Sequence, residues 1–101
     1  MPPGFPVAEA MYLRGALAFE LGDYAEAAPW LARVAEALQP GADEPYRAEL
    51  AANRLLAYRN ATIAWLFAGD AAEARKMLDE ARARDPESEA GLREIAALLP
   101  P

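Results

Sequence analysis

The chain has 101 residues, enough for one modest hydrophobic core, and it contains neither cysteine nor histidine. Disulfides, thiolate chemistry and the usual zinc and haem ligands are therefore excluded. The formal net charge of −6 repels phosphate backbones and anionic lipid headgroups, so we expect neither a nucleic acid nor a membrane as a partner.

The composition is typical of helices. Hydrophobic residues make up 54% of the chain, alanine is abundant, and Val, Ile and Thr are scarce, which predicts an all-α fold. The first residues form no basic and apolar leader. No stretch approaches the ~18 consecutive apolar residues of a membrane span. We therefore expect a cytoplasmic protein.

Proline and glycine divide the chain into five segments with helical apolar periodicity. The predicted helices cover residues near 6–21, 24–38, 45–68, 71–84 and 87–98. The breaks after the first and third helices share one motif, Gly22-Asp23 and Gly69-Asp70, each followed three residues later by a glutamate. Glycine can end a helix in the left-handed conformation, aspartate can cap the next helix, and the glutamate can complete a capping box. The sequence therefore predicts two helical hairpins.

Packing positions repeat between the two hairpins when the glycines of their turns are aligned. The small positions are Gly15 and Ala27 in the first copy and Thr62 and Ala74 in the second. The larger positions are Met11, Ala18, Tyr24 and Leu31, then Tyr58, Trp65, Ala71 and Leu78. This pattern resembles the tetratricopeptide repeat family, although the two turns lie farther apart than that family's ~34-residue period.

The resemblance implies a single domain of antiparallel helical hairpins. Its parts would be repeat one at 8–40, a loop and helix extension at 41–54, repeat two at 55–86, and a capping helix at 87–99. The last helix has Asp85 as a candidate N-cap and Pro86 at its first position. Its apolar face comprises Leu92, Ile95, Ala96 and Leu99. Such a helix would close the stack, since a terminal repeat otherwise leaves an apolar face in water.

Residues suited to catalysis have simpler structural explanations. Ser88 lies early in a predicted helix, Thr62 occupies a packing position, and Lys76 is expected to be a solvated surface charge. The run Asp85-x-Glu87-x-Glu89 contains a proline and lacks the glycine turn of a calcium loop. We therefore expect no enzyme activity, no cofactor and no metal.

The stretch 55–67 is apolar on nearly every side, so it must be covered from several directions. The resemblance places part of it on a concave ligand surface, together with matching positions of the first helix that include Glu9, Ala16 and Glu20. This surface would be an apolar, aromatic groove with an acidic rim and one basic residue, Arg59. The expected partner-binding residues are Tyr12, Phe19, Leu56, Arg59, Asn60, Ile63, Leu66 and Phe67.

The expected partner is a protein or peptide. One branch of the family clamps a C-terminal carboxylate with Lys, Arg and Asn side chains. Asn60 is placed like one of them, but Tyr12 and Ala16 replace others. An apolar helix or extended apolar segment is therefore the better expectation, and the protein would act as an adaptor.

Alternatives remain at this stage. The closing helix could fold over the same surface. A second copy of the chain could bury it, since two repeats are fewer than the ~3 usually needed for stability. Arg47 and Arg54 share a helix face, which could receive an acidic partner or be solvated.

Overall fold

The computed structural model describes residues 5–38 and 47–100. Within these ranges the chain is all-α and contains no strand, as predicted. The helices are α1 (Phe5–Glu20), α2 (Tyr24–Ala37), α3 (Arg47–Phe67), α4 (Ala71–Arg84) and α5 (Glu89–Ala96), with a 3₁₀ turn η1 (Pro86–Ser88) before α5. None of the described helices is both long and apolar enough to cross a membrane.

Both Gly-Asp turns end a helix in the predicted way. Gly22 and Gly69 have φ values of 78° and 85°, in the left-handed region that glycine adopts without a steric penalty. The N–H of Gly22 donates to the carbonyl of Phe19 at 3.0 Å, and that of Asp23 donates to the carbonyl of Ala18 at 2.9 Å. The equivalent bonds recur around Gly69. These bonds satisfy carbonyls that a helix end leaves unpaired.

The aspartate of each turn begins the next helix. The Asp23 carboxylate accepts from the N–H of Glu26 at 3.3 Å, and the Asp70 carboxylate accepts from the N–H of Glu73 at 3.0 Å. The N–H of each aspartate already donates to the preceding helix. In a capping box, the glutamate side chain would accept a hydrogen bond from this N–H group. Here a carbonyl of the preceding helix accepts that bond instead.

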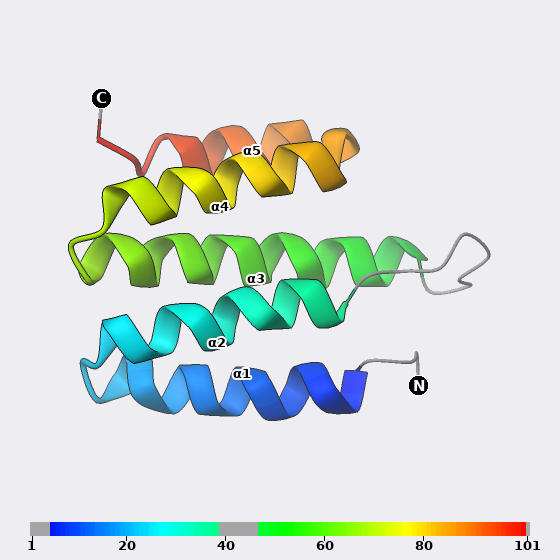
Figure 1. The fold of residues 1–101 in the computed structure, drawn as a ribbon. Coiled ribbons are helices and arrows are strands. Elements are labelled where there is room, and N and C mark those ends of the chain that lie inside the picture. Colours follow the sequence, from blue (N-terminus) through cyan, green and yellow to red (C-terminus); the bar gives the residue numbers. More distant parts are fainter. Residues whose placement is uncertain (1–4, 39–46, 101) are drawn as a thin grey trace.

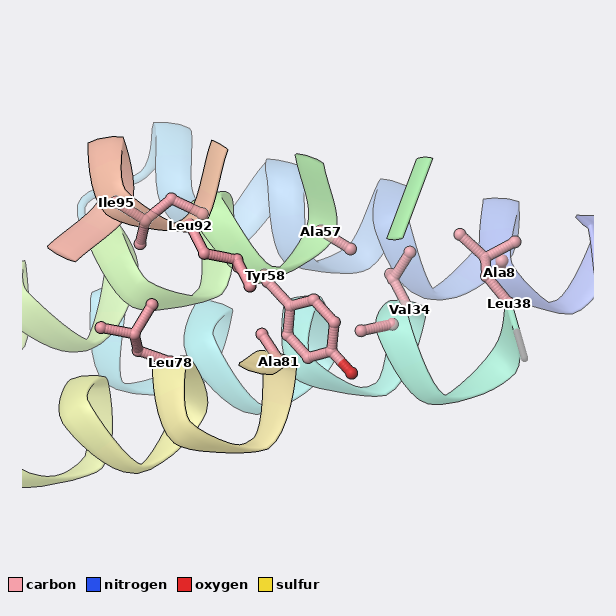
Figure 2. Packing of buried hydrophobic residues seen from close by; sticks show 10 residues of the cluster. Ala8, Val34, Leu38, Ala57, Tyr58, Leu78, Ala81, Leu92 and Ile95 are labelled. Atoms are coloured by element: carbon pink, nitrogen blue, oxygen red, sulfur yellow. The ribbon is translucent and has the colours of Figure 1, made fainter. Parts of the chain in front are cut away.

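Consecutive helices run antiparallel, and α1 and α5 lie at opposite edges of the stack (Figure 1). Helices α1 and α3 both pack on α2, while α3 and α5 both pack on α4. This connectivity places α1, α3 and α5 in one layer and α2 and α4 in the other (Figure 2). The loop predicted between the second and third helices lies outside the described residues.

The core is organised around the Tyr58 ring, which projects from α3 between α2 and α4 (Figure 2). The same cluster contains Val34 from α2, Leu38 at the C-cap of α2, and Leu78 from α4. Toward the Gly-Asp turns the core consists mostly of alanine. That second cluster comprises Ala18, Ala27, Ala28, Leu31, Ala61 and Ala64. Small residues there allow the helix backbones to approach closely.

The predicted small positions are tightly enclosed. A Cβ added to Gly15 would lie 2.8 Å from Cδ2 of Leu31, so glycine allows α1 to pack closely on α2. Thr62 is buried, and its hydroxyl donates to the carbonyl of Tyr58 at 2.7 Å. Ala27 and Ala74 are also fully buried. Gly15 thus marks a close approach of α1 to α2, and the other three small positions are buried in the core.

The closing helix buries the predicted apolar face. Leu92 and Ile95 are buried, and Ala96 and Leu99 pack against the same cluster. A Cβ added to Gly91 would lie 2.6 Å from Cδ2 of Leu55, so α5 crosses α3 closely there.

The interpretation of Asp85 as a side-chain cap is wrong. Its carboxylate makes no capping hydrogen bond and instead binds the Arg54 guanidinium in the protein interior. The interpretation of Arg54 as a solvated or partner-binding charge is wrong for the same reason, since it is buried. The side chain of Arg47, its expected companion, lies outside the described residues.

Candidate functional site: an interaction groove between α1 and α3

A groove runs between α1 and α3, and α2 forms its floor. It consists of two adjoining hollows with volumes of about 210 and 370 Å³. Tyr12 of α1 and Asn60 of α3 line both hollows, so the two hollows adjoin at these residues. We call the two adjoining hollows together the α1–α3 groove.

The smaller hollow lies toward the Gly-Asp turns. Its lining comprises Tyr12, Ala16, Phe19, Glu20, Leu31, Asn60 and Ile63. The larger hollow lies toward the start of α1. Its lining comprises Ala8, Glu9, Tyr12, Val34, Leu38, Asn53, Leu56, Ala57 and Asn60.

Five of the eight predicted partner-binding residues line the groove. Tyr12 and Phe19 come from α1, and Leu56, Asn60 and Ile63 come from α3. Helical periodicity explains this result, because residues three, four and seven apart share a helix face. The side chains of Tyr12 and Leu56 are about half exposed, so both are accessible to a ligand.

Phe67 belongs to an aromatic cluster at the end of the groove. Its ring centroid lies 5.9 Å from that of Phe19 and 5.1 Å from that of Tyr24. Phe19 and Tyr24 meet edge to face at 5.1 Å. Phe67 lines neither hollow, but it contacts Phe19, which does.

Arg59 and Leu66 lie on α3 outside both hollows. Arg59 is exposed and Leu66 is partly buried. Neither is among the lining residues of the groove. Arg59 and Leu66 therefore do not lie in the groove with the predicted residues that line it.

Sequence reasoning missed the floor of the groove and one polar wall residue. Leu31 and Val34 of α2 and Leu38 at its C-cap line the hollows between α1 and α3. Asn53 lies seven residues before Asn60 and shares its face, a spacing that could have identified it. The Asn53 amide donates to the carbonyl of Glu49 at 2.9 Å. The floor could not be identified, because α2 residues look like ordinary core positions in the sequence.

The described part of α5 does not contribute to the lining of the groove. It packs on α3 and α4, and its apolar residues meet the cluster around Tyr58. All lining residues lie in α1, in α2 or its C-cap Leu38, or in α3. In the described residues, the closing helix therefore does not fold over this surface, contrary to one alternative considered from the sequence.

The charged residues that line the groove are acidic. Glu9 borders the larger hollow and Glu20 the smaller one, and both side chains are exposed. The uncharged polar residues that line the groove are Tyr12, Asn53 and Asn60. Among the residues that the structure describes, no three acidic, histidine or cysteine side chains lie close enough together to hold a metal ion.

The chain matches no protein-family model, no curated protein and no solved structure when it is compared with each. We therefore infer a function from the groove itself.

Proposed function

We propose that this protein is a binding scaffold of the tetratricopeptide type, in which the α1–α3 groove holds an extended apolar segment of another protein. The observation that carries the proposal is that two partly apolar hollows adjoin at Tyr12 and Asn60 between α1 and α3. Apolar depressions on a protein surface commonly mark interaction sites. The two repeated Gly-Asp turns and the enclosed small residues support the repeat assignment.

The shape of the groove favours a chain segment over a compact small molecule. Small-molecule sites usually enclose roughly 300–1,000 Å³ and cover most of the ligand. Here the larger hollow, about 370 Å³, lies within that range and the smaller, about 210 Å³, below it, but both are open to solvent and would leave much of a compact ligand uncovered. An extended peptide would place successive side chains in successive hollows.

The polar groups favour an extended segment over a helix. An extended backbone has unpaired N–H and C=O groups, whereas a helix satisfies most of its own. The Asn60 amide can both donate and accept a hydrogen bond, and it stands where the two hollows join. The exposed Glu9 and Glu20 favour basic residues flanking the apolar part of the segment.

The test is to select peptides on the immobilised protein from a random display library and to measure the affinity of the selected peptides by calorimetry. Tyr12→Ala and Asn60→Ala should each weaken binding about tenfold or more. Leu13→Ala is the matched control, because Leu13 is adjacent in sequence, exposed, and outside the groove. Circular dichroism verifies that all variants remain helical. Unchanged affinity in both groove variants would refute the proposal.

A second copy of this chain is the alternative occupant of the groove. Two-fold pairing of two grooves would bring Glu9 and Glu20 of both copies together in a protein whose net charge is already −6. Like charges at an interface disfavour association, so a different protein is the better-supported partner.

A further inference from the structure

The two acidic residues of the α1–α3 groove lie at its opposite ends. Glu9 borders the larger hollow and Glu20 the smaller one, and both side chains are exposed. No lysine or arginine is among the lining residues. None of the ion pairs among the described residues involves either carboxylate. Each end of the groove therefore presents a negative charge that a bound segment can pair.

The two glutamates lie on the same side of α1. They are eleven residues apart in the helix, which is about three full turns. At a rise of about 1.5 Å per residue, they are separated by roughly 16 Å along the helix axis. Between them, Tyr12 and Ala16 line the groove from the same helix. Glu9 and Glu20 thus mark the two ends of one groove wall.

The distance between the glutamates restricts the ligand. An extended segment along this wall rises about 3.3 Å per residue, so it covers the interval with roughly five residues. Successive side chains of an extended chain point to opposite faces, and two that both reach α1 are therefore an even number of residues apart. Spacings of about four and six residues bracket the interval, and the flexible stems of lysine and arginine can span the remaining difference of about 3 Å.

The two ends of the groove differ in their aromatic residues. Glu20 lines the smaller hollow together with Phe19, whose ring centroid lies 5.1 Å from that of Tyr24 and 5.9 Å from that of Phe67. None of these three aromatic residues lines the larger hollow at Glu9. A planar guanidinium can pair with a carboxylate and stack on an aromatic ring at the same time, which an ammonium does less well. The Glu20 end therefore favours arginine over lysine.

We propose that the groove recognises an extended protein segment with two basic residues about four or six positions apart and apolar residues between them, and that the basic residue at the Glu20 end is an arginine. This inference rests on the proposed function and adds the sequence motif of the ligand. A basic segment also complements the net charge of −6 of this chain.

The first experiment selects random peptides, long enough to span the groove, from a display library on four immobilised proteins. These are the parent protein, Glu9→Lys, Glu20→Lys and the control Glu94→Lys. Glu94 is exposed on α5 and lies outside the groove, so this control makes the same change in net charge. The parent and the control should both enrich peptides with the basic pair. Glu9→Lys and Glu20→Lys should each replace one basic residue of the pair by an acidic residue.

The second experiment assigns each basic residue to its carboxylate by calorimetry with one peptide selected on the parent protein. Glu20→Gln should weaken binding about threefold, because the pair is exposed. Replacing the arginine of the peptide by norleucine should abolish this difference between Glu20→Gln and the parent. Replacing the same arginine by lysine should weaken binding more than replacing an arginine by lysine at the Glu9 end. Glu94→Gln should leave the affinity unchanged.

The outcomes separate this inference from the proposed function. Peptides that lose affinity for Tyr12→Ala but carry no enriched basic pair would overturn the motif and leave the proposed function intact. The motif would also be overturned if Glu20→Lys selected the same peptides as the parent, or if basic pairs were enriched at odd spacings. A library that yields no peptide dependent on Tyr12 would refute the proposed function and this inference with it. Circular dichroism verifies that the charge variants remain helical.

Equal losses from the arginine-to-lysine change at both ends of the peptide would show that the Glu20 end does not select arginine.

Discussion

Arg54 and Asp85 form a two-point ion pair inside the protein, although they are 31 residues apart in the sequence. The Nε of Arg54 donates to Oδ2 of Asp85 at 2.9 Å, and Nη2 donates to Oδ1. The remaining nitrogen, Nη1, donates to the Leu38 carbonyl at 2.8 Å. The Arg54 guanidinium, on α3, thus connects the C-terminal ends of α2 and α4.

Breaking this pair from one side should strongly destabilise the protein. Arg54→Met leaves the buried Asp85 carboxylate without its partner, and we expect the free energy of unfolding in urea to fall by about 3–5 kcal/mol. The double variant Arg54→Met with Asp85→Leu should be less destabilised than Arg54→Met alone, since no buried charge remains. A double variant at least as unstable as the single variant would contradict this account.

The exposed pair between Arg82 and Glu89 provides the comparison. Its atoms are 3.4 Å apart, and both side chains are about 40% exposed. Exposed ion pairs contribute roughly 0–1 kcal/mol. Arg82→Met should therefore change the free energy of unfolding by about 1 kcal/mol or less in the same urea titration.

Replacement of the turn glycines should destabilise the fold through the backbone alone. No atom beyond the chain neighbours lies within 4 Å of a Cβ added to Gly22 or Gly69, but both have positive φ. Gly22→Ala and Gly69→Ala should each lower the free energy of unfolding by about 1–2 kcal/mol. Asparagine tolerates this conformation better than alanine, so Gly22→Asn should lower the free energy of unfolding less than Gly22→Ala does. Thermal unfolding of the three variants distinguishes these outcomes.

The Tyr58 hydroxyl is buried and forms no hydrogen bond of ordinary geometry with the residues that the structure describes. Burial raises the pKa of Tyr58 above its usual value of 10.0, and the nearby Arg84 guanidinium offsets part of this rise. The raised pKa means that the folded state disfavours tyrosinate. The resulting stability is fully present below about pH 10 and is lost as pH rises through the folded-state pKa.

Tyr58→Phe tests this relationship. The variant should be as stable as the parent protein or more stable at neutral pH, because it removes a buried hydroxyl that lacks an ordinary hydrogen bond. Above about pH 10 the parent protein should lose more stability than the variant. Urea titrations at both pH values measure the difference, and equal losses in the two proteins would contradict the assignment to Tyr58.

Phe67→Ala should affect stability more than ligand binding. The ring contacts Phe19 and Tyr24 but lines neither hollow. Loss of its aromatic contacts should lower the free energy of unfolding by about 1 kcal/mol. Affinity for a selected peptide should fall less than in Tyr12→Ala. A larger loss of affinity than in Tyr12→Ala would show that Phe67 contacts the ligand directly.

The sequence by itself determined the helices, the turns and the close approaches between helices. These features depend on local signals, such as the left-handed preference of Gly22, the capping carboxylate of Asp23 and the missing side chain of Gly15. The resemblance to tetratricopeptide repeats led us to expect a shared surface for eight residues, and five of them, Tyr12, Phe19, Leu56, Asn60 and Ile63, line the groove. Their spacing along α1 and α3 explains why they share helix faces.

Only the tertiary structure decided what the sequence left open. The pairing of Arg54 with Asp85 and the groove floor at Leu31 depend on which helices lie next to each other, and spacing along the chain does not encode that arrangement. The exposure of Leu17 also depends on how the helices are arranged. Its apolar side chain resembles a core residue in the sequence, and it is exposed because α1 is the edge of the stack, with its neighbour α2 packed against the opposite face.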